Sequence, residues 1–197
     1  GNSFDWCRQV AEWVKSGVIG DVHEAHCWTD RPIWPQGLAE PKGGVPVPAA
    51  LDWDLFIGPA ARRPYDPAYT PWNWRGFWDF GTGALGDMAC HIMDPLYWAL
   101  DLKYPSSVEG SSTLSNLYSP PQAQKVTYKF PARPPKGNVN MPELTVYWYD
   151  GGLVPDRPKE LKDGEMMGDS NGGIILVGTK GKIMTGCYGM NPTLLPT

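Results

Sequence analysis

The sequence predicts an α+β fold in which helices pack on one face of a predominantly antiparallel sheet and a long aromatic loop interrupts the chain. An amphipathic helical pattern and a single strand open the chain, and several consecutive strand-like runs fill its second half. Between them lies a long stretch rich in aromatic residues, glycine and proline. Runs of strands after an opening helix and strand are typical of α+β sheets with the helices gathered on one face. We expect one domain over residues 1–197.

The opening helix is expected to begin after Ser3, acting as its N-cap, and to end at Gly17. Its apolar positions at helical spacing are Trp6, Val10, Trp13 and Val14. A strand is expected next, over residues 18–29.

Strand-like patterns then recur after the middle of the chain. The expected strands are residues 108–117, 125–130, 144–149, 174–178 and 182–185. The last two are joined by Thr179-Lys180-Gly181, which predicts a hairpin turn. In residues 144–149 the tyrosines alternate with Leu144, Val146 and Trp148, which gives the strand one apolar face and one tyrosine face. Residues 189–197 are expected to trail off unpaired.

The long loop, residues 30–75, predicts the wall of a binding pocket, because long ordered loops in compact domains are more often functional than accidental. One helical turn is expected in it, at residues 53–58. Indole rings stack on the apolar faces of sugars, and arginine adds hydrogen-bond donors. The candidate substrate contacts are Arg31, Trp34, Trp72, Trp74 and Arg75.

A glycine-rich turn, with Gly81, Gly83 and Gly86, runs into a short helix expected at residues 86–93 and suits close approach of a ligand to the backbone. Asp87 and His91 are four residues apart, so a helix places both on one face. Histidine titrates near neutrality, so such a pair suits proton transfer to or from a hydroxyl. The alternative is a structural pair, which is common on helices. Asp94 is interpreted as the N-cap of a second helix, residues 95–100.

Composition excludes several classes of protein. The net charge is −4 and the 17 Lys and Arg residues form no run or stripe, which argues against a nucleic-acid partner. The apolar runs are too short to cross a bilayer, so we expect a soluble chain with no membrane partner, in the cytoplasm or exported to the periplasm. The four cysteines are scattered without a C-x-x-C pair, and we expect neither disulfides nor a metal site.

Two adjoining stretches carry a resemblance to a known family. Residues 86–94 read Gly-Asp-Met-Ala-Cys-His-Ile-Met-Asp, and residues 74–85 read Trp-Arg-Gly-Phe-Trp-Asp-Phe-Gly-Thr-Gly-Ala-Leu. This segment resembles the second domain of the glucose-fructose oxidoreductase / inositol dehydrogenase / MocA (Gfo/Idh/MocA) family, in the bacterial branch with a long loop. The resemblance continues through residues 3–17, 20–22, 28–32, 53–55 and 178–182. Its most specific element is the pattern D-x-x-x-H-x-x-D, filled by Asp87, His91 and Asp94.

The resemblance implies an N-terminal Rossmann domain that binds NAD or NADP, followed by a sheet domain that binds substrate and forms subunit contacts. By this resemblance His91 exchanges a proton with the substrate hydroxyl, Asp87 orients it and binds a neighbouring hydroxyl, and Gly83 lies on the nicotinamide side. The family's Glu-Lys-Pro motif has no counterpart in this sequence, and residues 81–86 match a G-x-G-x-x-G spacing without the βαβ unit that it requires.

We therefore expect residues 1–197 to be the substrate-binding and oligomerisation domain of an NAD(P)-dependent oxidoreductase. Its substrate is expected to be a sugar, cyclitol or related polyol, and the fragment to be inactive without its Rossmann domain. Two alternatives stay open. One is an NAD-dependent glycoside hydrolase of the same family, and the other is a carbohydrate-binding or oligomerisation domain without chemistry, which assembles as a homo-oligomer through its sheet.

Overall fold

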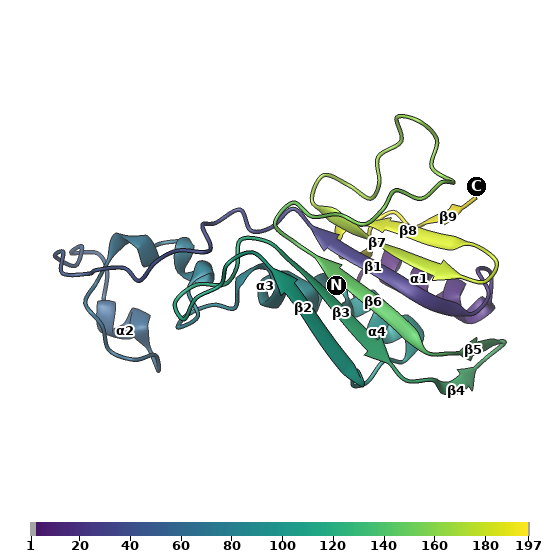
Figure 1. Ribbon diagram of the computed structural model, residues 1–197, viewed down its shortest axis with the longest axis horizontal. Coiled ribbons are helices and arrows are strands. Elements are labelled where there is room, and N and C mark those ends of the chain that lie inside the picture. Colours follow the sequence, from purple (N-terminus) through teal and green to yellow (C-terminus); the bar gives the residue numbers. More distant parts are fainter. Residues whose placement is uncertain (1–2, 197) are drawn as a thin grey trace.

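The chain forms a body built on a large sheet and an arm, residues 30–82, that projects from one end of the body (Figure 1). The computed structural model describes residues 3–196. The fold is α+β, as the sequence predicts, and the arm is the long aromatic loop.

The main sheet has seven strands in the order β2-β3-β6-β1-β7-β8-β9. Their bounds are Val22–Thr29 for β1, Ser107–Ser112 for β2, Gln124–Phe130 for β3, Leu144–Tyr149 for β6, Gly172–Gly178 for β7, Lys182–Gly186 for β8 and Thr193–Leu195 for β9. Only β1 and β6 pair in parallel, and every other pairing in this sheet is antiparallel. A second, two-stranded sheet joins β4 (Arg133–Lys136) to β5 (Val139–Met141).

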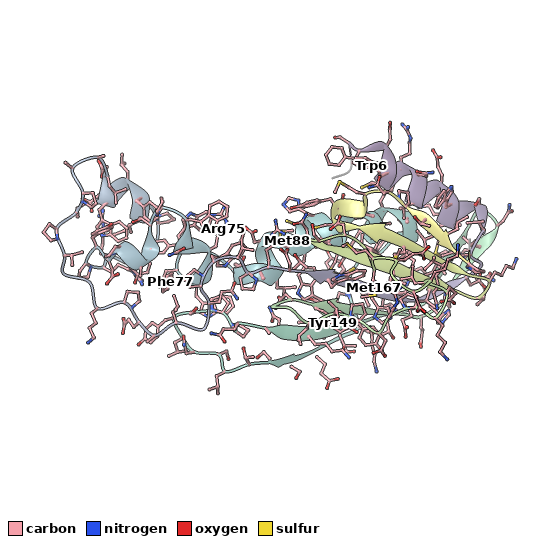
Figure 2. All side chains as sticks on the ribbon, turned by 90° about the horizontal axis from the view of Figure 1, so that it is seen from above. Trp6, Arg75, Phe77, Met88, Tyr149 and Met167 are labelled. Carbon is pink, nitrogen blue, oxygen red and sulfur yellow. The ribbon has the colours of Figure 1, made fainter. Side chains whose placement is uncertain are left out.

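Helices α1 (Asp5–Ser16), α3 (Gly83–Ile92) and α4 (Asp94–Leu100) pack on one face of the main sheet (Figure 1). The core residues that they bury include Val10, Val14, Met88, Ile92, Leu96 and Leu100, against Ala25, Val146, Trp148 and Leu176 of the strands. Figure 2 shows α1 with Trp6 on one side of the sheet and Tyr149 toward the other. Among the described residues, no helix combines the length and the apolar character needed to cross a membrane.

The arm has a small aromatic core of its own. It contains α2 (Trp53–Ile57) and the 3-10 turns η1 (Pro67–Tyr69) and η2 (Asn73–Gly76). The rings that meet there are Trp53, Phe56, Tyr65, Tyr69, Phe77 and Phe80. Arg63 lies over two of these rings and pairs with Asp79 at 2.5 Å. The arm thus packs around its aromatic rings, although its regular elements are short.

Several expected details are wrong. Phe4, not Ser3, is the N-cap of α1, and the Phe4 side chain forms no capping hydrogen bond. Asp94 is the first residue of α4 and not its cap, a position where a carboxylate is favourable because it faces the positive end of the helix dipole. The first strand begins at Val22 because Gly20 has a positive φ of 73°. The segment expected at residues 108–117 ends as a strand at Ser112, and residues 193–195 are not unpaired but form β9 beside β8.

The side chain of Gln36 links the first turn of α3 to the arm by hydrogen bonds. Its side chain is 3% exposed, and its Oε1 accepts hydrogen bonds from Trp34 Nε1 and from the backbone N–H of Ala84, both at 2.9 Å. Its Nε2 donates to the carbonyl of Pro121 at 2.6 Å. Ala84 lies in the first turn of α3, where backbone N–H groups have no partner within the helix. Gln36 therefore fixes the position from which Asp87 and His91 project.

Asp150 forms a second buried network, at the end of β6. It is fully buried, and its carboxylate accepts hydrogen bonds from Trp148 Nε1 at 2.9 Å and from the backbone and side-chain nitrogens of Gln124 at 3.0 Å each. These bonds join the end of β6 to the beginning of its antiparallel neighbour β3.

Replacing Gln36 by Leu should lower the free energy of unfolding by about 2 kcal/mol, because it leaves buried polar groups of Trp34, Ala84 and Pro121 without partners. Urea unfolding of the variant and the wild type gives this difference. The matched control is Gln122→Leu at an exposed position, which should change stability little. A Q36L variant as stable as the wild type would contradict the anchoring role.

Replacing Asp150 by Ala should destabilise the fold by about 1–3 kcal/mol, because Trp148 Nε1 is then buried without an acceptor. The same unfolding measurement tests this, with exposed Asp163→Ala as the control. Equal losses for the two variants would show that the network contributes nothing.

Asp150 should also leave a signature in the pH dependence of stability. Burial raises the pKa of its carboxyl above the ordinary 3.8, although the hydrogen bonds from Trp148 and Gln124 lower it. The folded chain then binds this proton more tightly than the unfolded chain. The contribution is fully present below the ordinary pKa and is lost as pH rises through the raised one. Unfolding free energies across this range should show that slope in the wild type and lack it in D150A.

Candidate active site

Helix α3 presents Asp87 and His91 on one outward face. Met88 and Ile92, which directly follow Asp87 and His91 in the chain, are buried in the core. Asp87 and His91 are therefore directed away from the core. His91 is exposed and the Asp87 side chain is 32% exposed. Within residues 3–196 no hydrogen bond joins these two side chains. The sequence thus placed them on one face, but the partner of Asp87 lies elsewhere.

That partner is Arg75, at the junction of the arm and the body (Figure 2). Arg75 Nε lies 3.4 Å from Asp87 Oδ1. Its guanidinium carbon is 4.0 Å from the ring centroid of Trp72 and 4.3 Å from that of Trp74. An arginine held by two indoles is in a favourable cation–π arrangement, and its planar donors stay fixed in direction. Asp87 is therefore positioned by the arm.

The indoles named as substrate contacts have different surroundings. Trp72 is 47% exposed, whereas Trp34 is 4% exposed and donates its Nε1–H to Gln36. The Trp34 ring lies 5.8 Å from the guanidinium carbon of Arg75 and meets the Trp72 ring edge at 6.4 Å between centroids. Trp34 therefore supports the Arg75 cluster from beneath, and Trp72 has the more accessible ring.

Arg31 lies at the other side of the α3 surface, at the end of β1. Its guanidinium pairs with Asp30 and lies 3.3 Å from Asn171 Oδ1, with 18% of its side chain exposed. Arg31 is within electrostatic reach of Tyr188 and Cys187.

Tyr188 also belongs to this surface, although no sequence pattern selects it as a site residue. Its ring meets that of His91 edge-on, with centroids 5.5 Å apart and planes at 73°. Tyr188 follows β8, far from His91 in the chain, and no motif marks it. Only the sheet topology brings it to α3, so local sequence patterns could not have found it. Gln36 was missed for the same reason.

The glycine turn before α3 packs against the protein itself. A Cβ on Gly81 would lie 2.6 Å from the Arg75 Cα, and one on Gly83 would lie 2.7 Å from the Pro120 Cβ. Gly83 also has a φ of +65°, a backbone conformation that side chains disfavour. These internal contacts account for both glycines without a ligand.

His91 is exposed, and a hollow lies close to it in the sequence of α3. A cavity of about 440 Å³ on the neighbouring face of α3 and α4 is lined by Ala89, Cys90, Met93, Asp94, Tyr97 and Tyr128. No three His, Cys, Asp or Glu side chains of residues 3–196 gather as a metal site. The chemistry on this face is that of an imidazole, a carboxylate, two guanidinium groups, a phenol and the accessible indole of Trp72.

Comparisons with solved structures show the fold. An oxidoreductase from Thermotoga maritima is similar at 14% identity and a TM-score of 0.50, over 98% of this chain and 42% of that one. An NAD-binding oxidoreductase from Klebsiella pneumoniae is similar at 15% identity and a TM-score of 0.49, over 95% of this chain and 39% of that one. The WlbA dehydrogenase from Bordetella pertussis, in complex with NADH and UDP-GlcNAcA, is similar at 15% identity and a TM-score of 0.45. The similarity covers 93% of this chain and 40% of that one. The chain thus spans about two fifths of the length of these structures.

A search of the curated proteins finds no match. The comparison with family models does. Residues 14–132, more than half of the chain, match the C-terminal alpha/beta domain of an oxidoreductase family. This stretch runs from the end of α1 through the arm, the glycine turn, and helices α3 and α4 to the end of β3. The chain therefore belongs to the Gfo/Idh/MocA oxidoreductase family.

Proposed function

We propose that this chain is the substrate-binding domain of an NAD(P)-dependent oxidoreductase that acts on a sugar, cyclitol or related polyol. The observation that carries the proposal is the outward pair on α3, an exposed imidazole beside a carboxylate that Arg75 holds at 3.4 Å. The family supplies the reaction class. The NADH and sugar nucleotide in the Bordetella pertussis structure belong to that protein and are consistent with it only as a class.

In this proposal His91 takes the proton from the substrate hydroxyl. Because His91 is exposed, its imidazole can meet a substrate oxygen, and histidine is suited to proton transfer at neutral pH. Asp87, held by Arg75, accepts a hydrogen bond from a neighbouring substrate hydroxyl. The exposed Trp72 ring offers an apolar face to the carbon skeleton. NAD or NADP, when bound by the complete protein, would supply the hydride acceptor for this oxidation.

The open surface around His91 fits a site that a second domain completes. We propose that the complete protein carries a Rossmann domain for NAD or NADP, as the family resemblance implies, and that this chain alone is inactive. The coverage of about two fifths of each matched structure supports this proposal. The arm, with Arg31, Trp74 and Arg75 near its two ends, forms the remaining wall.

Replacing His91 by Ala in the full-length protein should lower kcat by about 10²–10⁴-fold, the range for loss of a general acid or base. Nucleotide binding, measured by fluorescence titration with NADH, should be unchanged. The matched control is His23→Ala, an exposed histidine on β1, which should keep full activity. Turnover of H91A at the wild-type rate would refute the catalytic role.

The same assay separates the two enzyme hypotheses. Net formation of NADH or NADPH from added polyols supports the dehydrogenase. Release of sugar from aryl glycosides without net change of the nicotinamide absorbance supports the glycoside hydrolase, for which the aromatic arm is also suited. If neither occurs with the wild-type protein, the chain is a binding or assembly domain.

We further propose that the sheet face opposite the helices joins two copies of this chain. His26 stacks on Tyr147 with centroids 5.1 Å apart, and Lys125 Nζ lies 4.9 Å from the same Tyr147 ring. These half-buried and exposed groups lie on adjacent strands, and tyrosine is enriched at subunit interfaces. Part of the same face is covered by Leu161 and Met167 from the loop before β7.

Replacing Tyr147 by Glu should dissociate the assembly, because it places a charge in the centre of the face. Sedimentation velocity of wild type and variant measures this, with exposed Tyr104→Glu as the control. A wild-type protein that sediments as a single chain at every concentration would exclude the proposed contact.

A further inference from the structure

Tyr188 is held in an uncommon backbone conformation beside His91. Its φ is 62° and its ψ 18°, the left-handed region, which is unfavourable for residues other than glycine by about 1–2 kcal/mol. The neighbouring Gly189 also has a positive φ, of 78°, so the chain turns sharply here. Strained residues of this kind cluster at functional sites, so a role for the Tyr188 side chain is expected.

The turn around Tyr188 is fixed from both sides. The backbone N–H of Cys187 donates to Asp169 Oδ2 at 2.8 Å, and that of Gly186 donates to the carbonyl of Met190 at 2.7 Å. The Cys7 thiol of α1 lies 3.5 Å from the carbonyl oxygen of Tyr188 itself. The ring therefore has a defined direction, and it is directed edge-on to the His91 ring.

The Tyr188 hydroxyl is free to bind another molecule. Within residues 3–196 no protein group forms a hydrogen bond with it, although the residue is half-buried. The pKa of this phenol is raised above its ordinary value, mainly by burial and then by Cys187. Arg31 lowers this pKa, and Asp87 and Asp30 raise it. The phenol thus stays protonated at neutral pH and is a donor. The hydroxyl therefore lies within electrostatic reach of both Arg31 and Asp87.

We infer that Tyr188 is a further substrate-positioning residue, whose hydroxyl donates a hydrogen bond to a substrate oxygen beside His91. The inference rests on the proposed function, because it concerns the same polyol site. The edge-on ring contact sets the orientation of the imidazole, and the hydroxyl holds the substrate oxygen within its reach. The substrate is then bounded by Tyr188 and Arg31 on one side and by Asp87 and Arg75 on the other.

Tyr188→Phe in the full-length protein is the test, since phenylalanine keeps the ring contact with His91 and removes only the hydroxyl. We expect kcat/KM for the best polyol of a panel containing myo-inositol and D-glucose to fall about tenfold, which corresponds to one lost hydrogen bond. The dissociation constant of that polyol, measured by calorimetry, should rise by a similar factor. Thermal stability should stay within error of the wild type. Tyr104→Phe, at an 87% exposed tyrosine, is the matched control.

The outcomes separate this inference from the proposed function. If H91A loses turnover while Y188F keeps wild-type kcat/KM and wild-type polyol affinity, the proposed function stands and the role of Tyr188 is refuted. If the wild type neither turns over nor binds any polyol of the panel, both fall. If Y188F loses activity and is also clearly less stable than the wild type, the role of Tyr188 in substrate binding is refuted, because the hydroxyl then supports the fold. Tyr188→Gly, which relieves the backbone strain, should be active only weakly even where it folds well.

Discussion

Burial of Met88 and Ile92 against the sheet is the constraint on which the candidate site depends. The two side chains are four residues apart on α3 and enter the core, where they meet residues of the strands and of α4. Because a helix turns by about 100° per residue, the preceding positions, Asp87 and His91, are then directed outward together. The apolar core thus determines which polar side chains the helix presents. Gln36, which binds Ala84, fixes where along the sheet this face begins.

The arm gives the outward face its electrostatic character. The guanidinium of Arg75 lies close to the Trp72 and Trp74 rings and pairs with Asp87, so a positive charge from the arm is set beside a negative charge from the body. Exposed ion pairs contribute little to stability, but partly buried arginines stacked on indoles keep their donors in fixed directions. The aromatic core of the arm supports this arrangement. Its rings fix the chain that carries Arg75, and they explain why a long segment with few regular elements holds a defined shape.

The sheet brings a third part of the chain to the same place. Strand β8 and the turn after it lie near the end of the chain, yet the antiparallel pairing with β7 returns them to α3 and α1. Tyr188 reaches His91 by this route, and Arg31 arrives from the end of β1. Three segments that are remote in sequence therefore surround one helix face. The opposite face of the sheet carries Tyr147 and His26, which are separate from this chemistry.

The sequence by itself determined the class of the fold, the alternation of Leu144, Val146 and Trp148 along β6, the hairpin between β7 and β8, and the common face of Asp87 and His91. Each of these follows from a local period of two or of 3.6 residues, or from turn chemistry, and such signals are contained in a few consecutive residues. It placed the caps of α1 and α4 wrongly and missed β9, because helix ends and short edge strands depend on neighbours outside the segment. Only the tertiary structure decided that Asp87 pairs with Arg75, that Trp34 is buried on Gln36, and that Tyr188 meets His91. These contacts join residues whose proximity is set by strand order and core packing, and no local pattern records either.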